Sequence, residues 1–88
     1  MKSTVIKRSV VLAGHKTSVS LEDAFWSSLR EIAKGEGKSL TQVISSIDAD
    51  RQFTNLSSAI RLFVLGFYRG QLQRLDLEIS GRKLATAA

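Results

Sequence analysis

The alternating stretch from His15 to Leu21, which reads His-Lys-Thr-Ser-Val-Ser-Leu, constrains the fold of this chain more than any other feature. Apolar or β-branched residues alternate with polar ones, which is the pattern of a half-buried β-strand. The side facing the core would carry Thr17, Val19 and Leu21. The opposite side would carry Lys16, Ser18 and Ser20.

This strand needs a pairing partner, because a lone strand leaves its backbone N–H and C=O groups unsatisfied. A helical pattern begins directly after it, at Glu22, so no hairpin partner follows. We therefore expect the same strand of a second copy to pair with it in the antiparallel sense. Such a two-stranded ribbon would present its polar side twice and would fit the major groove of DNA.

The charge of the chain favours a polyanionic partner. Thirteen Lys and Arg residues stand against eight Asp and Glu, which gives a net charge of +5. The first twenty residues contain no acid and carry the cations Lys2, Lys7, Arg8 and Lys16. A basic domain of this kind gains affinity for nucleic acid by neutralising phosphates, although ordinary solubility charge is the simpler reading.

The size of the chain favours dimerisation. It has 88 residues, of which 43% are hydrophobic, and it contains no cysteine for a disulfide. A small single domain hides that much apolar surface poorly, and a second copy would cover it. The absence of cysteine agrees with a reducing cytoplasm, and we expect a soluble cytoplasmic protein because no apolar run is long enough to span a membrane.

Two amphipathic helices are predicted after the strand. The first, over about residues 22–34, carries apolar residues at i+3 and i+4 spacing and stops at Gly35 and Gly37. The second follows Ser39, a favourable N-cap residue, and ends near Asp50.

A third helix is predicted from a cap at Asn55 or Ser57 to about Gly70 or beyond. Apolar residues cover nearly its whole circumference, which is typical of a buried helix. In a protein with three helices, we expect a second subunit to cover its far side. The segment after this helix resembles a frayed tail.

The N-terminal segment over residues 1–14 begins as a basic arm. Its run from Ser9 to Ala13 has β character without alternation, and Gly14 separates it from the main strand. Two interpretations remain open for it: an arm that lies along DNA, or a strand that extends the ribbon.

Three motifs carry a resemblance to a known family: Lys-Arg-Ser-Val at residues 7–10, Gly-His-Lys-Thr-Ser-Val-Ser-Leu-Glu-Asp-Ala-Phe-Trp at 14–26, and Asn-Leu-Ser-Ser-Ala-Ile-Arg-Leu-Phe-Val-Leu at 55–65. With them, residues 7–69 resemble the ribbon-helix-helix family, and in particular its short bacterial members. The resemblance implies a mostly α-helical chain with one short β-strand that forms an intertwined homodimer. Two subunits would then share an antiparallel two-stranded ribbon, and an additional C-terminal helix would follow. The expected organisation is an arm over residues 1–14, the domain over 15–72 and a tail over 73–88.

The resemblance also implies site residues. Base-reading positions are matched by Lys16, Ser18 and Ser20, for which the simpler reading is a solvated strand face. The phosphate clamp of the family is matched by Gly37, Lys38 and Ser39, with Asn55, Leu56 and Ser57 as the alternative because that segment also resembles a family second helix. Further phosphate or minor-groove contacts are expected from Lys7 and Arg8. The expected dimer core comprises Val19, Leu21, Phe25, Trp26, Leu29, Ile32, Ile44, Ile60, Phe63, Val64 and Phe67.

Catalysis and metal binding have little basis in this sequence. His15 is the only histidine, there is no cysteine, and no nucleophile–base pair or phosphate loop is recognisable. We expect no enzyme activity, no cofactor and no metal.

The leading hypothesis is a homodimeric, sequence-specific DNA-binding repressor or autoregulator, and assembly into higher oligomers on DNA stays open. The alternative is an antitoxin-like module that binds a protein partner through apolar C-terminal residues, namely Leu72, Leu75, Leu77 and Ile79.

Overall fold

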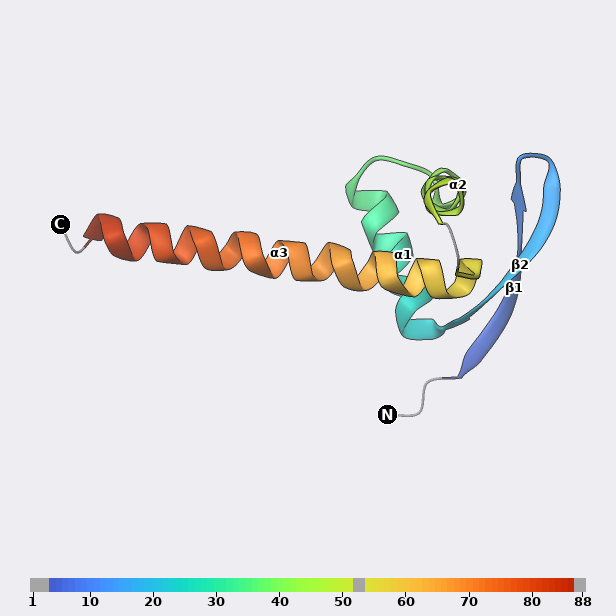
Figure 1. Ribbon diagram of the computed structural model, residues 1–88, viewed down its shortest axis with the longest axis horizontal. Helices are drawn as coiled ribbons and strands as arrows, with labels where there is room; N and C mark the ends of the chain where they lie inside the picture. The colour runs from blue at the N-terminus through green and yellow to red at the C-terminus, as the bar shows by residue number, and fades with distance from the viewer. Residues whose placement is uncertain (1–3, 52–53, 87–88) are drawn as a thin grey trace.

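A computed structural model describes residues 4–51 and 54–86 of the chain. Within these residues a β-hairpin is followed by three helices: β1 (Val5–Leu12), β2 (His15–Glu22), α1 (Asp23–Gly35), α2 (Leu40–Asp50) and α3 (Leu56–Thr86). Figure 1 shows the hairpin at one end of the molecule, beside the first turns of α3, with α1 and α2 packed against the N-terminal half of α3.

The hairpin corrects the prediction that β2 lacks a partner in its own chain. β1 pairs with β2 antiparallel over their full length, from Val5 opposite Glu22 to Leu12 opposite His15. Ala13 and Gly14 connect the strands with φ angles of 51° and 77°, both in the left-handed region that a type I′ turn requires. Residues 4–51 and 54–86 therefore contain two strands where one was expected, and the second interpretation of residues 9–13, a strand in the ribbon, is the correct one.

The first two helices form where the sequence predicts them. α1 spans Asp23–Gly35 and closes with Gly37 at a φ of 68°. Ser39 caps α2 in a complete capping box, in which its hydroxyl accepts from the Gln42 N–H and the Gln42 side chain accepts from the Ser39 N–H. The N-cap residue of α1 is Glu22, and its side chain makes no cap hydrogen bond.

The core of the described chain forms without a second subunit. Seven residues expected in a dimer core are each at most 4% exposed inside the single chain: Val19, Leu21, Leu29, Ile32, Ile44, Ile60 and Val64. The other four pack against this core while remaining partly exposed: Phe25, Trp26, Phe63 and Phe67. These seven side chains are therefore buried within one chain, and their place in a dimer core stays a prediction. Burial of each large aliphatic side chain contributes about 1.5–3 kcal/mol to folding.

α3 is longer than predicted. It continues to Thr86, so most of the expected tail over residues 73–88 is helical, and residues 87–88 lie outside the described part. Its first turns pack on α1, α2 and β2, whereas its C-terminal half extends beyond the other elements (Figure 1). Large apolar side chains stay exposed along it, at Leu62, Leu65, Leu72, Leu75, Leu77 and Ile79. Across the described residues, no helix is apolar over a length that would cross a membrane.

Candidate nucleic-acid interface

The hairpin presents one polar face to the outside. Val19 and Leu21 of β2 are buried, Ser20 between them is partly exposed, and Lys16 and Ser18 before them are exposed. The alternation therefore predicts the buried side at Val19 and Leu21, whereas Thr17, expected on the same side, is exposed near the turn. The cross-strand pairs on this outer face are Val11 with Lys16, Ser9 with Ser18, and Lys7 with Ser20. The structure thus brings the three predicted base-reading residues onto one face together with Lys7.

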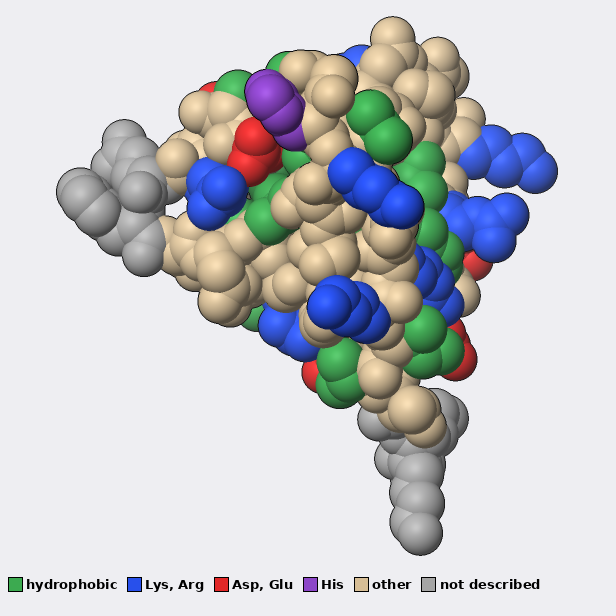
Figure 2. All heavy atoms as spheres, turned by 90° about the vertical axis from the view of Figure 1, so that its right-hand side faces the viewer, with side chains coloured by type: hydrophobic (Ala, Val, Ile, Leu, Met, Phe, Trp, Pro, Cys, Tyr) green, Lys and Arg blue, Asp and Glu red, His purple; other side chains and the backbone are tan. Residues whose placement is uncertain are grey.

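This outer face is suited to a polyanion. It carries two cations, Lys7 and Lys16, and three serines, and Glu22 lies at the end away from the turn. The exposed side chains of Val5 and Val11 share this face. Figure 2 views the molecule from this end and shows Lys and Arg side chains spread across the surface, while most of the visible acidic ones lie nearer its margins. Two strands of eight residues form a ribbon about 27 Å long, and a two-stranded ribbon has the width that the major groove admits.

Arg8 lies on the other face of the hairpin, apart from Lys7. Its Nη2 donates to the Asp23 carboxylate at 2.8 Å, and its guanidinium carbon lies 4.6 Å from the ring centre of Trp26. The Arg8 side chain is 23% exposed, and its charge is balanced by Asp23. In this arrangement Arg8 attaches β1 to the start of α1 through an ion pair and a cation–π contact.

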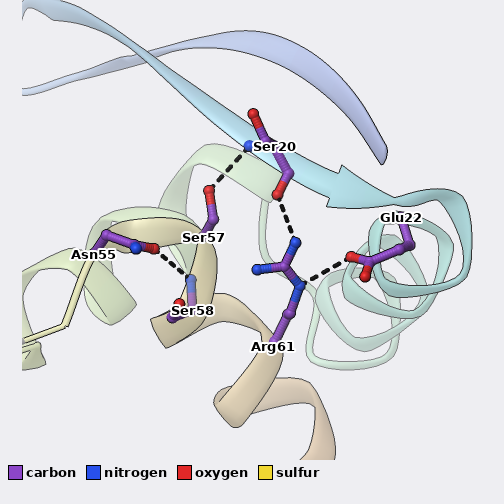
Figure 3. A network of polar contacts seen from close by, with 6 residues as sticks. All are labelled: Ser20, Glu22, Asn55, Ser57, Ser58 and Arg61. Carbon is purple, nitrogen blue, oxygen red and sulfur yellow. Dashed lines mark hydrogen bonds and ion pairs between the residues drawn. The ribbon is translucent and has the colours of Figure 1, made fainter. Parts of the chain in front are cut away.

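The open edge of β2 is bound by α3 at Ser20. In a two-residue hairpin the pair that flanks the turn is hydrogen-bonded, so Lys16, Ser18 and Ser20 direct their backbone groups away from β1. At Ser20 the N–H donates to the Ser57 hydroxyl at 2.9 Å, and the C=O accepts from Arg61 Nη2 at 3.0 Å. Figure 3 shows both contacts coming from the first two turns of α3.

Arg61 also binds the Glu22 carboxylate, with 2.9 Å between Nε and Oε1. The hydrogen bond from the Glu22 backbone N–H lowers the pKa of this carboxyl below its ordinary value, and the bond from Arg61 lowers it further. The carboxylate therefore stays ionised at neutral pH and holds Arg61 against the end of β2.

The sequence offers two helix N-termini for the phosphate clamp, one at the start of α2 and one at the start of α3, and their surroundings in the structure differ. At the start of α2, Ser39 uses its hydroxyl in the capping box, and Lys38 lies 3.3 Å from the Glu36 carboxylate. The α1–α2 connection, which holds Gly37, arches over the side of the molecule away from the hairpin (Figure 1). At the start of α3, Asn55 accepts from the Ser58 N–H, and the next turn is bonded to β2. The structure thus joins the alternative clamp segment, and not the first one, to the ribbon.

Sequence reasoning missed two residues of this region, Ser9 and Arg61. Ser9 belongs to the outer face only because the register pairs it with Ser18. The signal that could have found it was the Ala-Gly dipeptide between two segments of β character, a hairpin turn read instead as a break. Arg61 had no local signal, since its partners lie about forty residues away in sequence.

The part of the chain described by the structure holds no group of three His, Cys, Asp or Glu side chains that could bind a metal ion. The predicted site residues are instead hydroxyls, amides and cations, which donate hydrogen bonds to base edges and phosphates.

Comparison with known families gives one match. A family model described as a ribbon-helix-helix domain matches residues 5–68, which is more than half of the chain and includes the hairpin, α1, α2 and the packed part of α3. No curated protein and no solved structure matches the chain.

Proposed function

The chain belongs to the ribbon-helix-helix family, whose domains are typically non-enzymatic DNA-binding regulators, and we propose that it is a sequence-specific DNA-binding repressor or autoregulator of transcription. It inserts the outer face of its β1–β2 hairpin into the major groove. The observation that carries this proposal is the gathering of Lys7, Lys16 and three serines on one exposed face of a two-stranded ribbon. The family assignment gives no support to the antitoxin-like alternative.

Each reading residue has a distinct role in the proposal. Lys16 donates to the O6 and N7 acceptors of guanine, which is a common specific contact in the major groove. Ser18 and Ser20 have hydroxyls that both donate and accept, so they accommodate either type of base pair. Ser9, opposite Ser18, adds a hydroxyl at the middle of the ribbon, and Lys7 contacts the base or phosphate beside Ser20.

Phosphate contacts position the ribbon in the groove. The start of α3 lies at the edge of β2 through the Ser57–Ser20 bond, so its backbone N–H groups are near the ribbon. The start of α2, with Gly37, Lys38 and Ser39, is the second proposed contact, and Lys38 would have to exchange its contact with Glu36 for a phosphate. Replacing Lys38 with Ala should reduce the slope of log binding constant against log salt by about one if it binds a phosphate.

Two copies act together in this proposal, on adjacent half-sites of a palindromic operator. Each copy contributes a complete hairpin, because β1 already pairs with β2 within the chain. An intersubunit ribbon is therefore unnecessary for groove reading, in contrast to the expectation from sequence.

The test begins with selection of bound duplexes from a random pool, followed by titration of the consensus. Lys16→Ala should weaken specific binding by about 1–3 kcal/mol, or roughly 5- to 150-fold, while leaving the fold intact. The matched control is Lys34→Ala, which removes the same charge from the last turn of α1. If both variants lose affinity equally, or if Lys16→Ala binds like the parent, the hairpin face is not the reader.

A further inference from the structure

The C-terminal half of α3 carries an apolar stripe that its own chain does not cover. Leu65, Leu72, Leu75 and Ile79 are between 45% and 64% exposed. By contrast, Leu56, Ile60 and Val64 on the same helix are buried against the body. At 100° per residue the exposed stripe lies roughly a quarter-turn around the helix from the buried one. α3 therefore has two apolar faces, and only one of them packs within the chain.

The spacing of the exposed stripe is that of a coiled coil. Leu65, Leu72 and Ile79 are seven residues apart, and Tyr68 and Leu75 each follow three residues after one of them. Tyr68 is only partly exposed, because it packs against the core of its own chain and its hydroxyl donates to Glu31 Oε2 at 3.3 Å. This alternation of three and four residues defines the a and d positions of heptads. Leu77 is also exposed but falls outside the stripe. A stripe with heptad spacing is complementary to a second helix with the same spacing.

We propose that this stripe, which we call the α3 seam (residues 65, 72, 75 and 79), pairs with the α3 seam of a second copy in a parallel, in-register coiled coil. Its layers would join each residue to its equivalent in the partner. The flanking positions are compatible with this order: in a parallel pair, Gln71 faces Asp76 of the second copy, so no like charges oppose each other there.

We infer the parallel orientation of the two α3 helices from the position of the hairpin, and in this respect the inference rests on the proposed function. The hairpin lies across the N-terminal end of α3, with its outer face directed away from the C-terminal half (Figures 1 and 2). Parallel α3 helices would direct both outer faces the same way, toward one duplex. Antiparallel helices would direct them in opposite directions, so that one duplex could not contact both.

The seam covers only about two heptads, which is short for a coiled coil that is stable on its own. We therefore expect a dimer that dissociates on dilution and that re-forms on a duplex with two half-sites. Binding to that duplex should be cooperative, whereas binding to a single half-site should not depend on the seam.

Crosslinking tests the order of the helices, because the chain has no cysteine of its own. Leu72→Cys should form an intermolecular disulfide under mild oxidation, since a parallel pair brings the two equivalent positions together. The matched control is Leu77→Cys, which lies on the same exposed helix but off the seam. Equal crosslinking of both variants, or no crosslinking of Leu72→Cys, would overturn the parallel pairing.

Sedimentation of the full chain tests the seam itself. The double variant Leu72→Glu, Leu75→Glu should raise the dimer dissociation constant at least about 100-fold, because each subunit then places two charges in the apolar seam. Both positions are exposed, so the fold should survive, and Leu77→Glu should leave the dimer unchanged. A parent chain that remains monomeric at high concentration refutes the inference.

Titrations with one and two half-sites separate this inference from the proposed function. A seam variant that binds one half-site like the parent but loses cooperativity on two supports both. A monomeric parent that still binds DNA specifically overturns the seam and leaves the function standing. A crosslinked dimer with no affinity for DNA overturns the function and supports the seam.

Discussion

The contact between Ser57 and the edge of β2 makes a quantitative prediction about how the hairpin is held. The Ser57 hydroxyl accepts from the Ser20 N–H at 2.9 Å in a partly buried position. Ser57→Ala leaves this donor without its partner, and an unsatisfied buried donor costs about 1–3 kcal/mol. Because Ser20 is only half-buried and water can reach it in part, we expect the lower end of that range, about 1 kcal/mol.

Helix propensity acts in the opposite direction, since Ala is more favourable in a helix than Ser by up to ~0.5 kcal/mol. Ser58→Ala provides the matched control: it makes the same exchange one residue later, and no hydrogen bond of the Ser58 side chain is found among the described residues. Ser57→Ala should therefore be less stable than Ser58→Ala by about 1 kcal/mol, which corresponds to roughly 4–8 °C in Tm for a domain of this size.

Thermal and urea unfolding measure the difference, and amide hydrogen exchange locates it. Exchange at the Ser20 N–H should accelerate in Ser57→Ala and stay unchanged in Ser58→Ala. If the two variants unfold at the same temperature and the Ser20 amide is equally protected in both, α3 does not hold the edge of β2, and the reasoning fails.

Three further predictions concern the turn, the core and the acid range. Ala13 has a φ of 51°, which costs a non-glycine residue roughly 1–2 kcal/mol, so Ala13→Gly should stabilise the chain by about 0.5 kcal/mol and Gly14→Ala should destabilise it; unfolding curves that shift in the opposite directions would contradict the turn. Ile60 is fully buried, so Ile60→Ala should cost about 2–5 kcal/mol in urea unfolding, and a loss below 1 kcal/mol would mean that α3 does not pack there. Hydrogen bonds from the Glu22 backbone N–H and from Arg61 lower the pKa of the Glu22 carboxyl in the folded state. The contribution of this carboxylate to the free energy of unfolding is therefore complete above the ordinary pKa of 4.5, and it is lost as the pH falls through the lowered pKa of the folded state. Glu22→Gln should reduce this part of the acid dependence of Tm, and an unchanged acid profile would show that the ion pair with Arg61 is not coupled to folding.

Local patterns in the chain were sufficient for much of the fold. The alternation over residues 15–21 correctly identifies Val19 and Leu21 as the buried side of β2, because side chains of any strand point to opposite faces whichever strand pairs with it, although Thr17 on that side is exposed. The helix boundaries near Ser39 and Asn55 were likewise predictable, since a cap satisfies N–H groups only three residues away. For the same reason the polar side of β2, which we propose as part of the DNA reader, can be recognised from the alternation alone.

Contacts between segments that lie far apart in the sequence could be identified only from the tertiary structure. The pairing of β2 depends on a register that brings residues 5–12 back across the Ala13–Gly14 turn, and this register places Lys7 opposite Ser20 and Ser9 opposite Ser18. The attachment of Ser20 to Ser57 and Arg61 joins residues about forty positions apart. Burial of a core within one chain is likewise a sum over all elements, so a count of hydrophobic residues predicts that apolar surface must be covered without indicating which segment covers it.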